Sequence, residues 1–270
     1  MPNDGGFLCG YTDEDKNFIV QKYPLAEKYF RPFLGATEFI NNKKRWCLWL
    51  KDAKPNDLQN IPPILEAIKK VKELRMKSTR EATKKLAETP YLFGEIRQPD
   101  SNYLLIPRAS SENRKYIPMG FLSADIIAND TVQIIPNATR YEFGVLTSNV
   151  HMAWMRAVCG RLKSDYRYSN TIVYNNFPWC NPTEEQNAKI EKTAQGILNA
   201  RALYPECSLA DLYDELTMPP ELRKAHQEND KAVMEAYGFK IKDEQTGKYR
   251  WLSESETVAR LMQMYQELTK

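Results

Sequence analysis

The residues from Ser164 to Trp179 combine side-chain types that folding alone rarely brings together. These sixteen residues include aromatic rings, amides, hydroxyls and the cation Arg167, with almost no aliphatic side chains. A surface that binds a polyanion carrying stackable, hydrogen-bonding bases would use this mixture. An aromatic-rich strand and turn packed beneath a loop would use it equally well. The composition of this stretch therefore leaves both interpretations open.

A second polar stretch, from Arg108 to Tyr116, carries most of the side-chain types that pair with base edges. Arginine pairs with guanine, asparagine with adenine and glutamate with the cytosine amino group, and each well-placed pair contributes ~1–3 kcal/mol of discrimination. The stretch follows an expected strand that ends at Pro107, so we expect a loop. The alternative is an ordinary polar hairpin loop. The base-reading candidates are Ser110, Ser111, Glu112, Asn113, Arg114 and Lys115.

The charge of the chain is uneven along its length. Residues 61–180 carry 17 Lys and Arg against 11 Asp and Glu, whereas residues 181–270 carry 12 against 16. A basic middle favours contact with a polyanion. Ordinary variation in surface charge remains the alternative.

Sequence signatures of catalysis are missing. The chain has no glycine-rich phosphate loop, no GxSxG and no HExxH motif. Its five scattered cysteines and two distant histidines argue against a zinc site and suit a reducing cytosol. We expect His151 in the core or a lid and His226 on a solvated helix. The pattern favours binding over a self-sufficient active site.

The hydrophobic pattern predicts an α+β fold, a mixed α/β region followed by an all-helical one. The first 20 residues are expected to be a tail or linker. Residues 61–87 predict one long helix with a lysine-rich face, which is solvated or faces phosphates. The expected strands are 91–96, 103–107 and 131–135, and a helix is expected over 147–160.

The C-terminal residues, 183–270, predict helices alone. Thr183 with Gln186, and Ser253 with Glu256, are capping boxes, and Ser208 and Pro219-Pro220 open two further helices. No apolar run approaches the ~20 residues that cross a membrane. No basic stretch followed by an apolar block opens the chain, so we expect no signal peptide and a cytoplasmic protein without a membrane partner.

Several sequence blocks resemble the C-terminal part of single-chain, SAM-dependent class I DNA methyltransferases of the type IIL/IIG restriction–modification group. The order and spacing of the blocks match that family, and together they span nearly the whole chain. The blocks are Pro2–Gly6, Arg31–Ala36, Arg45–Leu50, Ser110–Phe121 and Ser164–Trp179. Cys180 departs from the pattern, where a second proline is expected.

The resemblance implies three parts, bounded at residues 1–60, 61–180 and 181–270. These are an exit segment from the methyltransferase core, a target recognition domain and a helical C-terminal domain. The family's catalytic Asn-Pro-Pro-Tyr motif and SAM-binding loop have no match, since Asn181-Pro182 continues as Thr183. We therefore expect an excised piece with Met1 as an added start. It would have no cofactor or metal and no methyl transfer of its own, and SAM would bind only in the parent enzyme.

The resemblance also implies a function, the recognition of a site in duplex DNA for an adenine-N6 methyltransferase. It places base readout on the loop around Glu112 to Lys115, with a further contribution from the polar segment near Lys163 to Thr171. Methyltransferase and nuclease domains of the same parent chain would be its protein partners. The alternatives are an assembly module that docks those domains without reading bases, and an independent enzyme with a dispersed site. The candidates for backbone contact are Lys69, Lys72, Arg108, Lys163, Arg167, Ser169 and Asn170.

Overall fold

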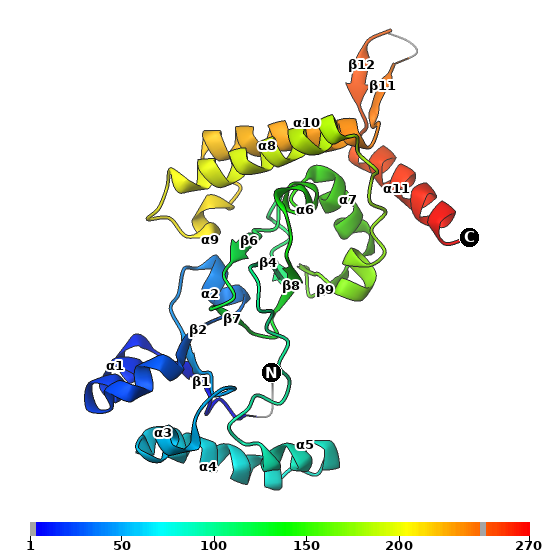
Figure 1. Cartoon of the computed structure of the whole chain (residues 1–270). Coiled ribbons are helices and arrows are strands. Elements are labelled where there is room, and N and C mark those ends of the chain that lie inside the picture. The colour runs from blue at the N-terminus through cyan, green and yellow to red at the C-terminus, as the bar shows by residue number, and fades with distance from the viewer. Residues whose placement is uncertain (1–3, 244–246) are drawn as a thin grey trace. The chain divides into compact units, whose positions relative to one another are not determined.

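The computed structural model describes residues 4–243 and 247–270, which form two compact units (Figure 1). The N-terminal unit contains residues up to 102 together with 122–131. The C-terminal unit contains residues 103–121 and 132–270. Pro2 and Asn3, which open the first of the resembling blocks, lie outside the described residues. The expected division at residues 60 and 180 stays a prediction.

The N-terminal unit is built on a four-stranded sheet in the order β1-β3-β2-β7. Its strands are β1 (Cys9–Tyr11), β2 (Phe30–Leu34), β3 (Trp46–Leu48) and β7 (Ile127–Ala128). β2 pairs antiparallel with β3 and parallel with β7, so residues far apart in the chain close one sheet. Helices and 3-10 turns surround it: α1 (Asp13–Lys22), η1 (Pro24–Tyr29), α2 (Ala36–Ile40), α3 (Pro55–Gln59), α4 (Pro62–Met76), α5 (Glu81–Lys85) and η2 (Leu86–Glu88).

The prediction of a tail over the first 20 residues was wrong. Thr12 and Asp15 form a capping box that starts α1, and Leu8 and Ile19 are buried in the core of this unit. Two buried side chains and a capped helix fix this segment in place.

The long helix expected over residues 61–87 is broken after Met76. Arg75 is 1% exposed, and its guanidinium donates hydrogen bonds to the carbonyls of Leu86, Thr89 and Leu92 at 2.8, 3.1 and 2.7 Å. The chain must turn back after α4 to bring these carbonyls to Arg75. The strand expected over 91–96 is also absent, and this segment is an irregular loop. The reason is the same, because the carbonyl of Leu92 bonds Arg75.

The C-terminal unit contains two three-stranded sheets. One has the order β6-β4-β8, with β4 (Tyr103–Pro107) in the centre, and the other has the order β5-β10-β9. The remaining strands are β5 (Ala109–Ser110), β6 (Gly120–Leu122), β8 (Val132–Pro136), β9 (Gly160–Leu162) and β10 (Asp165–Arg167). The strands expected over 103–107 and 131–135 are confirmed as β4 and β8, because both are short runs rich in branched side chains.

Helices pack around the β4 sheet. α6 (Arg140–Leu146) precedes α7 (Asn149–Val158), which confirms the helix expected over 147–160. A π-helix, η3 (Asn170–Tyr174), follows β10. The C-terminal helices are α8 (Glu184–Ala202), α9 (Leu209–Leu212), α10 (Pro220–Ala236) and α11 (Glu254–Leu268), and Thr183, Ser208 and Ser253 cap three of them as predicted.

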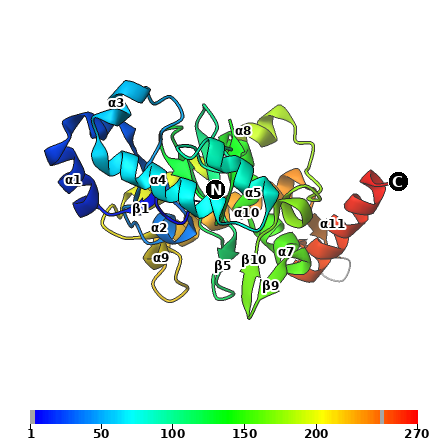
Figure 2. The same ribbon diagram turned by 90° about the horizontal axis from the view of Figure 1, so that it is seen from below.

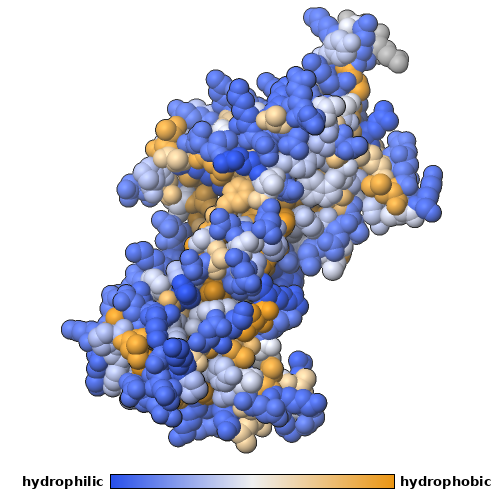
Figure 3. Space-filling view, viewed as in Figure 1, coloured by the Kyte–Doolittle hydropathy of each residue, from blue (hydrophilic) through white to orange (hydrophobic). Residues whose placement is uncertain are grey.

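The prediction of helices alone over 183–270 was wrong, because this mostly helical region also contains an antiparallel hairpin of β11 (Lys240–Lys242) and β12 (Tyr249–Trp251). α8 and α10 run side by side (Figure 1), and the surface over them is largely hydrophilic (Figure 3). Beneath them α6 approaches α8 at Gly144, where an added Cβ would lie 2.7 Å from the Ile190 side chain. The mixed first part and the mostly helical second part confirm the α+β fold class.

None of the helices within the described ranges is both long and apolar enough to cross a membrane.

Candidate nucleic-acid interface

The candidate loop, residues 110–115, is held by the β5-β10-β9 sheet. Ser110 pairs with Tyr166 across β5 and β10, and Tyr166 pairs with Arg161 across β10 and β9. Figure 2 shows β5 and the β9–β10 hairpin side by side. This sheet therefore brings together two stretches that lie about 50 residues apart in the sequence, and both had been selected as candidates.

The loop itself is a tight turn. The backbone N–H of Arg114 donates to the Ser111 carbonyl at 3.1 Å, and the N–H of Asn113 donates to Ser111 Oγ at 3.3 Å. Glu112, Asn113 and Lys115 are exposed, while Ser111 and Arg114 are half-buried. The turn satisfies its own backbone groups and presents the longer side chains outward.

Ser110 differs from the rest of the loop because it is 4% exposed. Its hydroxyl oxygen has no hydrogen-bond partner among the described residues. An unpaired buried hydroxyl costs ~1–3 kcal/mol.

The β9–β10 hairpin carries cations on an exposed ribbon. Every residue of β9 is exposed, and Leu162 has an exposed fraction of 60%. Lys163 turns the hairpin with a φ of 56°, in the left-handed region. Lys163 and Arg167 are both exposed. The hairpin thus offers charge and one apolar side chain beside the candidate loop.

Arg161 connects the hairpin with the loop. Its guanidinium lies 4.2 Å from the centre of the Tyr166 ring, and its Nη1 donates to the Ser164 carbonyl at 2.9 Å. The same Nη1 lies 3.7 Å from the Glu112 carboxylate, and both side chains are about two-fifths exposed. Arg161 is not among the residues that the sequence predicts for this site. Its position two residues before Lys163, on an alternating strand, was the available signal.

The segment after β10 is anchored by Tyr168, which is 1% exposed. Its backbone N–H donates to the Arg108 carbonyl at 2.8 Å, and its hydroxyl lies 2.9 Å from His151 Nε2. Ser169 Oγ pairs with Thr171 Oγ1 at 2.8 Å, and Asn170 is exposed. Arg108, Ser169 and Asn170 thus stand next to the same sheet.

The aromatic residues of this region mostly pack. Tyr166 is 6% exposed, and Tyr168 lies against the buried His151 ring. Trp179 contacts the rings of Tyr141 and Phe177. The packing interpretation of the Ser164–Trp179 stretch therefore holds for these tyrosines.

The two histidines are both buried, so the expectation of a solvated His226 was wrong. His226 is 0% exposed, its Nε2 lies 2.8 Å from the Tyr213 hydroxyl, and its ring stacks on that of Tyr116. Burial lowers the pKa of His226 well below its usual value, and it lowers the pKa of His151 to about 3. Both rings are therefore neutral at physiological pH. The polar neighbours of His226 in sequence had suggested exposure.

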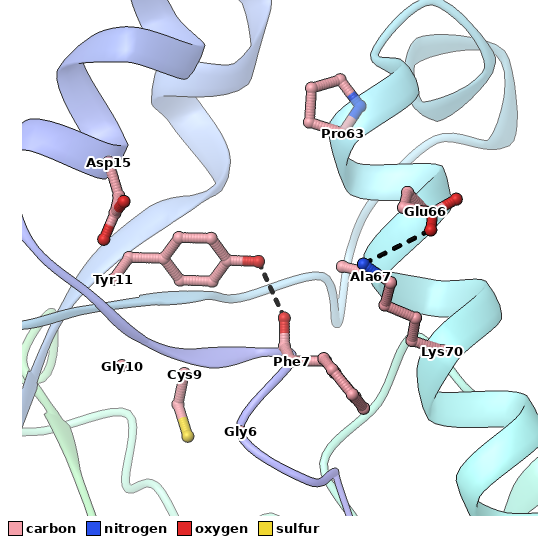
Figure 4. Close-up of a pocket in the computed structure, with 10 residues that line it drawn as sticks. All are labelled: Gly6, Phe7, Cys9, Gly10, Tyr11, Asp15, Pro63, Glu66, Ala67 and Lys70. Carbon is pink, nitrogen blue, oxygen red and sulfur yellow. Dashed lines mark hydrogen bonds and ion pairs between the residues drawn. The ribbon is translucent and has the colours of Figure 1, made fainter.

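Lys69 and Lys72 are exposed on α4, in the N-terminal unit, so they are not part of the cluster that the β5-β10-β9 sheet assembles. The same helix borders a pocket of about 290 Å³ (Figure 4). Within it Lys70 Nζ lies 3.4 Å from the Glu66 carboxylate, and the Tyr11 hydroxyl donates to the Phe7 carbonyl at 2.8 Å. The polar groups of this pocket thus mainly satisfy one another.

No group of three or more His, Cys, Asp or Glu side chains within residues 4–243 and 247–270 is arranged to hold a metal ion.

Comparison with known proteins identifies both parts of the chain. Residues 1–181 match the family model described as MmeI, target recognition domain, and residues 182–270 match the model described as MmeI, C-terminal domain. DNA methyltransferase A of Bacillus subtilis (strain 168) is 40% identical over 270 residues. A solved structure of the type IIL restriction-modification enzyme MmeI in complex with DNA is 48% identical and superposes with a TM-score of 0.92.

The matches cover nearly all of this chain but only part of each relative. The chain is covered to 100% by the Bacillus subtilis protein and to 99% by the MmeI structure. It spans 30% of the former and 34% of the latter, about a third of their length. The chain belongs to the MmeI family and comprises the target recognition domain of that family followed by its C-terminal domain.

Proposed function

We propose that this chain binds duplex DNA and reads a short base sequence on behalf of a site-specific DNA methyltransferase of the restriction–modification type. One observation carries the proposal. The β5-β10-β9 sheet holds residues 110–115, whose side chains are of types that hydrogen-bond base edges, beside the exposed and cationic β9–β10 hairpin. The 48% identical relative solved in complex with DNA supports duplex DNA as the ligand.

The base contacts are assigned to the candidate loop, residues 110–115. Glu112, Asn113 and Arg114 supply an acceptor, an amide and a bidentate donor, which suit different base edges in the major groove. Lys115 adds a donor, and the hydroxyls of Ser110 and Ser111 complete the set. Because Glu112 pairs with Arg161 in the free chain, base recognition by Glu112 exchanges that ion pair for a base contact.

The backbone contacts are assigned to the cations and polar groups around the loop. Lys163 and Arg167 are exposed on the hairpin, Arg161 joins them, and Ser169 and Asn170 follow. Arg108 precedes β5 in the same unit, and Lys69 and Lys72 supply a second group on α4. Such contacts fix the register of the protein on DNA and make its affinity depend on salt.

The chemistry is assigned to other domains of a longer protein. The relative named DNA methyltransferase A supports methyl transfer with S-adenosylmethionine as donor. The finer proposal is methylation of adenine at N6, for which the catalytic domain would flip the target base out of the duplex. The methyltransferase and nuclease domains would then be the protein partners of this chain, and such an enzyme would act in the cytoplasm.

Binding of duplexes at two salt concentrations tests the proposal. We expect the 270-residue chain to bind a mixture of random duplexes at about 50 mM salt and to lose affinity about 100-fold at about 200 mM, as about four phosphate contacts would give. Fluorescence anisotropy measures both values. The absence of binding at low salt would contradict the proposal and favour a module that assembles the parent enzyme without touching bases.

A further inference from the structure

We propose that Asp230, on helix α10 of the C-terminal domain, is a positioning residue for the candidate loop, which it holds through Tyr116. The proposal rests on the proposed function, because it assumes that residues 110–115 read bases. It assigns to the C-terminal helices a direct part in sequence recognition.

The first observation is the bond between the end of the loop and α10. Tyr116 directly follows Lys115 and is 2% exposed. Its hydroxyl donates a hydrogen bond to Asp230 Oδ2 at 2.7 Å. Its ring stacks on the ring of His226, with centroids 4.1 Å apart and planes inclined by 18°. His226 precedes Asp230 by four residues, so both lie on one face of α10. From that face Asp230 bonds the hydroxyl of Tyr116 and His226 stacks on its ring.

The second observation is that the carboxylate is itself fixed. Asp230 Oδ1 accepts the backbone N–H of Asn149 at 2.7 Å, and Asn149 is the first residue of α7. A helix N-terminus attracts an anion, since its first N–H groups have no partner within the helix. Both oxygens of Asp230 therefore have donors, one on α7 and one at the loop.

Two further bonds hold the backbone on either side of Tyr116. Arg156 Nη1 donates to the Lys115 carbonyl at 3.4 Å, and Arg156 is bound to Glu254 of α11 at 2.7 Å. Arg201 Nη1 on α8 donates to the Met119 carbonyl at 2.6 Å. Positions 115, 116 and 119 are thus held from α7, α10 and α8 respectively, and α11 is linked to the first of them through Arg156. Glu112, Asn113 and Lys115 stay exposed.

The chemistry of the contact fits positioning better than stability alone. Asp230 is 8% exposed, and removing a carboxylate from water is costly. A pair of apolar side chains in the same space would stabilise the fold as well or better. A directional hydrogen bond instead fixes one placement of Tyr116, and residues within four positions of it must then match base edges to a fraction of an ångström.

Three variants of the 270-residue chain test the proposal. Tyr116→Phe removes only the hydroxyl and keeps the ring on His226, and Asp230→Ala removes the carboxylate. The control is Asn229→Ala on the same helix. Asn229 is also buried, and its side chain bonds the Gly144 carbonyl at 2.7 Å and Thr193 at 3.0 Å, with no hydrogen bond to residues 110–119. The control variant Asn229→Ala therefore loses buried hydrogen bonds of the same kind, but at contacts with α6 and α8 and not with the loop.

The first readout needs no DNA. Amide hydrogen exchange of segment 111–119 should rise about tenfold or more in Tyr116→Phe and in Asp230→Ala, as local opening becomes easier. In Asn229→Ala the increase should fall on α6 and α8 instead. Unchanged exchange of segment 111–119 in both Tyr116→Phe and Asp230→Ala would show that the Tyr116–Asp230 hydrogen bond does not hold the loop, whether or not the chain binds DNA.

The second readout is base discrimination. For the duplex that the wild-type chain selects, the ratio of dissociation constants between singly substituted and selected duplexes should fall about tenfold in Tyr116→Phe, within the range of one base contact. Affinity for unrelated duplexes should change less than about twofold. An equal loss of discrimination in Asn229→Ala, or none in either loop variant, would overturn the positioning role. Failure of the wild-type chain to bind any duplex would instead refute the proposed function.

Discussion

At the scale of single residues, an ion pair joins Glu112, which we propose to read bases, with Arg161, which we propose to contact phosphate. The pair spans 3.7 Å between a loop side chain and the β9 strand, and it is partly exposed. An exposed pair of this kind contributes only ~0–1 kcal/mol, so DNA can replace it at small cost. Under the proposed function, this exchange would free Arg161 to contact phosphate and Glu112 to contact a base.

Arg161→Ala should therefore weaken binding without changing the preferred sequence. We expect affinity for all duplexes to fall about three- to tenfold and the slope of log K against log salt to become shallower by about 0.9, as the loss of one phosphate contact predicts. Anisotropy titrations over a salt series measure both. Arg223→Ala is the matched control, since Arg223 also pairs with a carboxylate, Glu215 at 2.9 Å. A changed base preference in Arg161→Ala would show that Arg161 reads bases.

Asp230 makes a second prediction at this scale, on stability against pH. Burial raises the pKa of Asp230 from 3.8 to about 6, although its bonds with Tyr116 and Asn149, and the charges of Lys115 and Arg156, lower it. The folded state therefore binds the proton of Asp230 more tightly than the unfolded state does. The stability that this proton contributes is fully present below about pH 4. It is lost as the pH rises to about 6.

The comparison with Asp230→Asn isolates this effect. Between pH 4 and pH 7 the free energy of unfolding of the wild type should fall relative to the variant by on the order of 3 kcal/mol. Denaturant titrations at the two pH values measure this difference. His226 and Tyr116, which face Asp230, keep constant charge over the range, because burial lowers the pKa of His226 and raises that of Tyr116. A constant difference between the two proteins would contradict the raised pKa.

At the scale of elements, the N-terminal unit depends on the buried guanidinium of Arg75. Its hydrogen bonds to the carbonyls of Leu86, Thr89 and Leu92 fix the segment after α4 to the helix and set where the chain reverses. Burial lowers the pKa of Arg75, which nonetheless stays charged. The buried Arg75 guanidinium therefore holds residues 86–92 against α4 through hydrogen bonds to their carbonyls.

Arg75→Met should destabilise the N-terminal unit by about 2–4 kcal/mol, because it keeps the apolar stem and leaves three carbonyls without this donor. Thermal unfolding monitored by circular dichroism tests this. Lys77→Met, an exposed change just past the end of the same helix, should shift stability by less than about 0.5 kcal/mol. Equal effects of the two substitutions would show that the hydrogen bonds of Arg75 do not stabilise this unit.

Local signals were the most predictable from the sequence. The caps at Thr183, Ser208 and Ser253, and the strands β4 and β8, depend on neighbours within a few residues. The break in the long helix after Met76 and the loop over 91–96 depend on Arg75, whose partners lie 11 to 17 positions away. His226 was misplaced because its polar neighbours in sequence suggested exposure, although its spacing from Leu222 and Val233 puts it on the buried face of α10.

The cluster around the candidate loop was only partly predictable for the same reason. The polar composition indicates residues 108–116 and 164–179 separately, and the pairing of β5 with β10 brings them together. Arg161 and Asp230 belong to that arrangement through contacts across strands and helices, which composition does not encode.

At the scale of the whole molecule, each compact unit has its own hydrophobic core. The N-terminal core gathers around the β1-β3-β2-β7 sheet, and the C-terminal core includes Tyr116, Trp154 and the inner faces of α8 and α10. The candidate loop and the helices that hold it belong to one unit. If the candidate loop reads bases as proposed, substitutions in the C-terminal domain should affect base preference as well as stability.

The most direct test of the central claim is the base preference of the chain and of its Arg114→Ala variant. Both proteins are used to select duplexes from a library with a randomised central segment, and the selected sequences are read. The wild type should enrich one short sequence, and Arg114→Ala should lose preference at one position of it while keeping the others. Enrichment of the same sequence by both proteins, with only weaker binding by the variant, would contradict base reading by Arg114, and the absence of any enriched sequence would contradict the account as a whole.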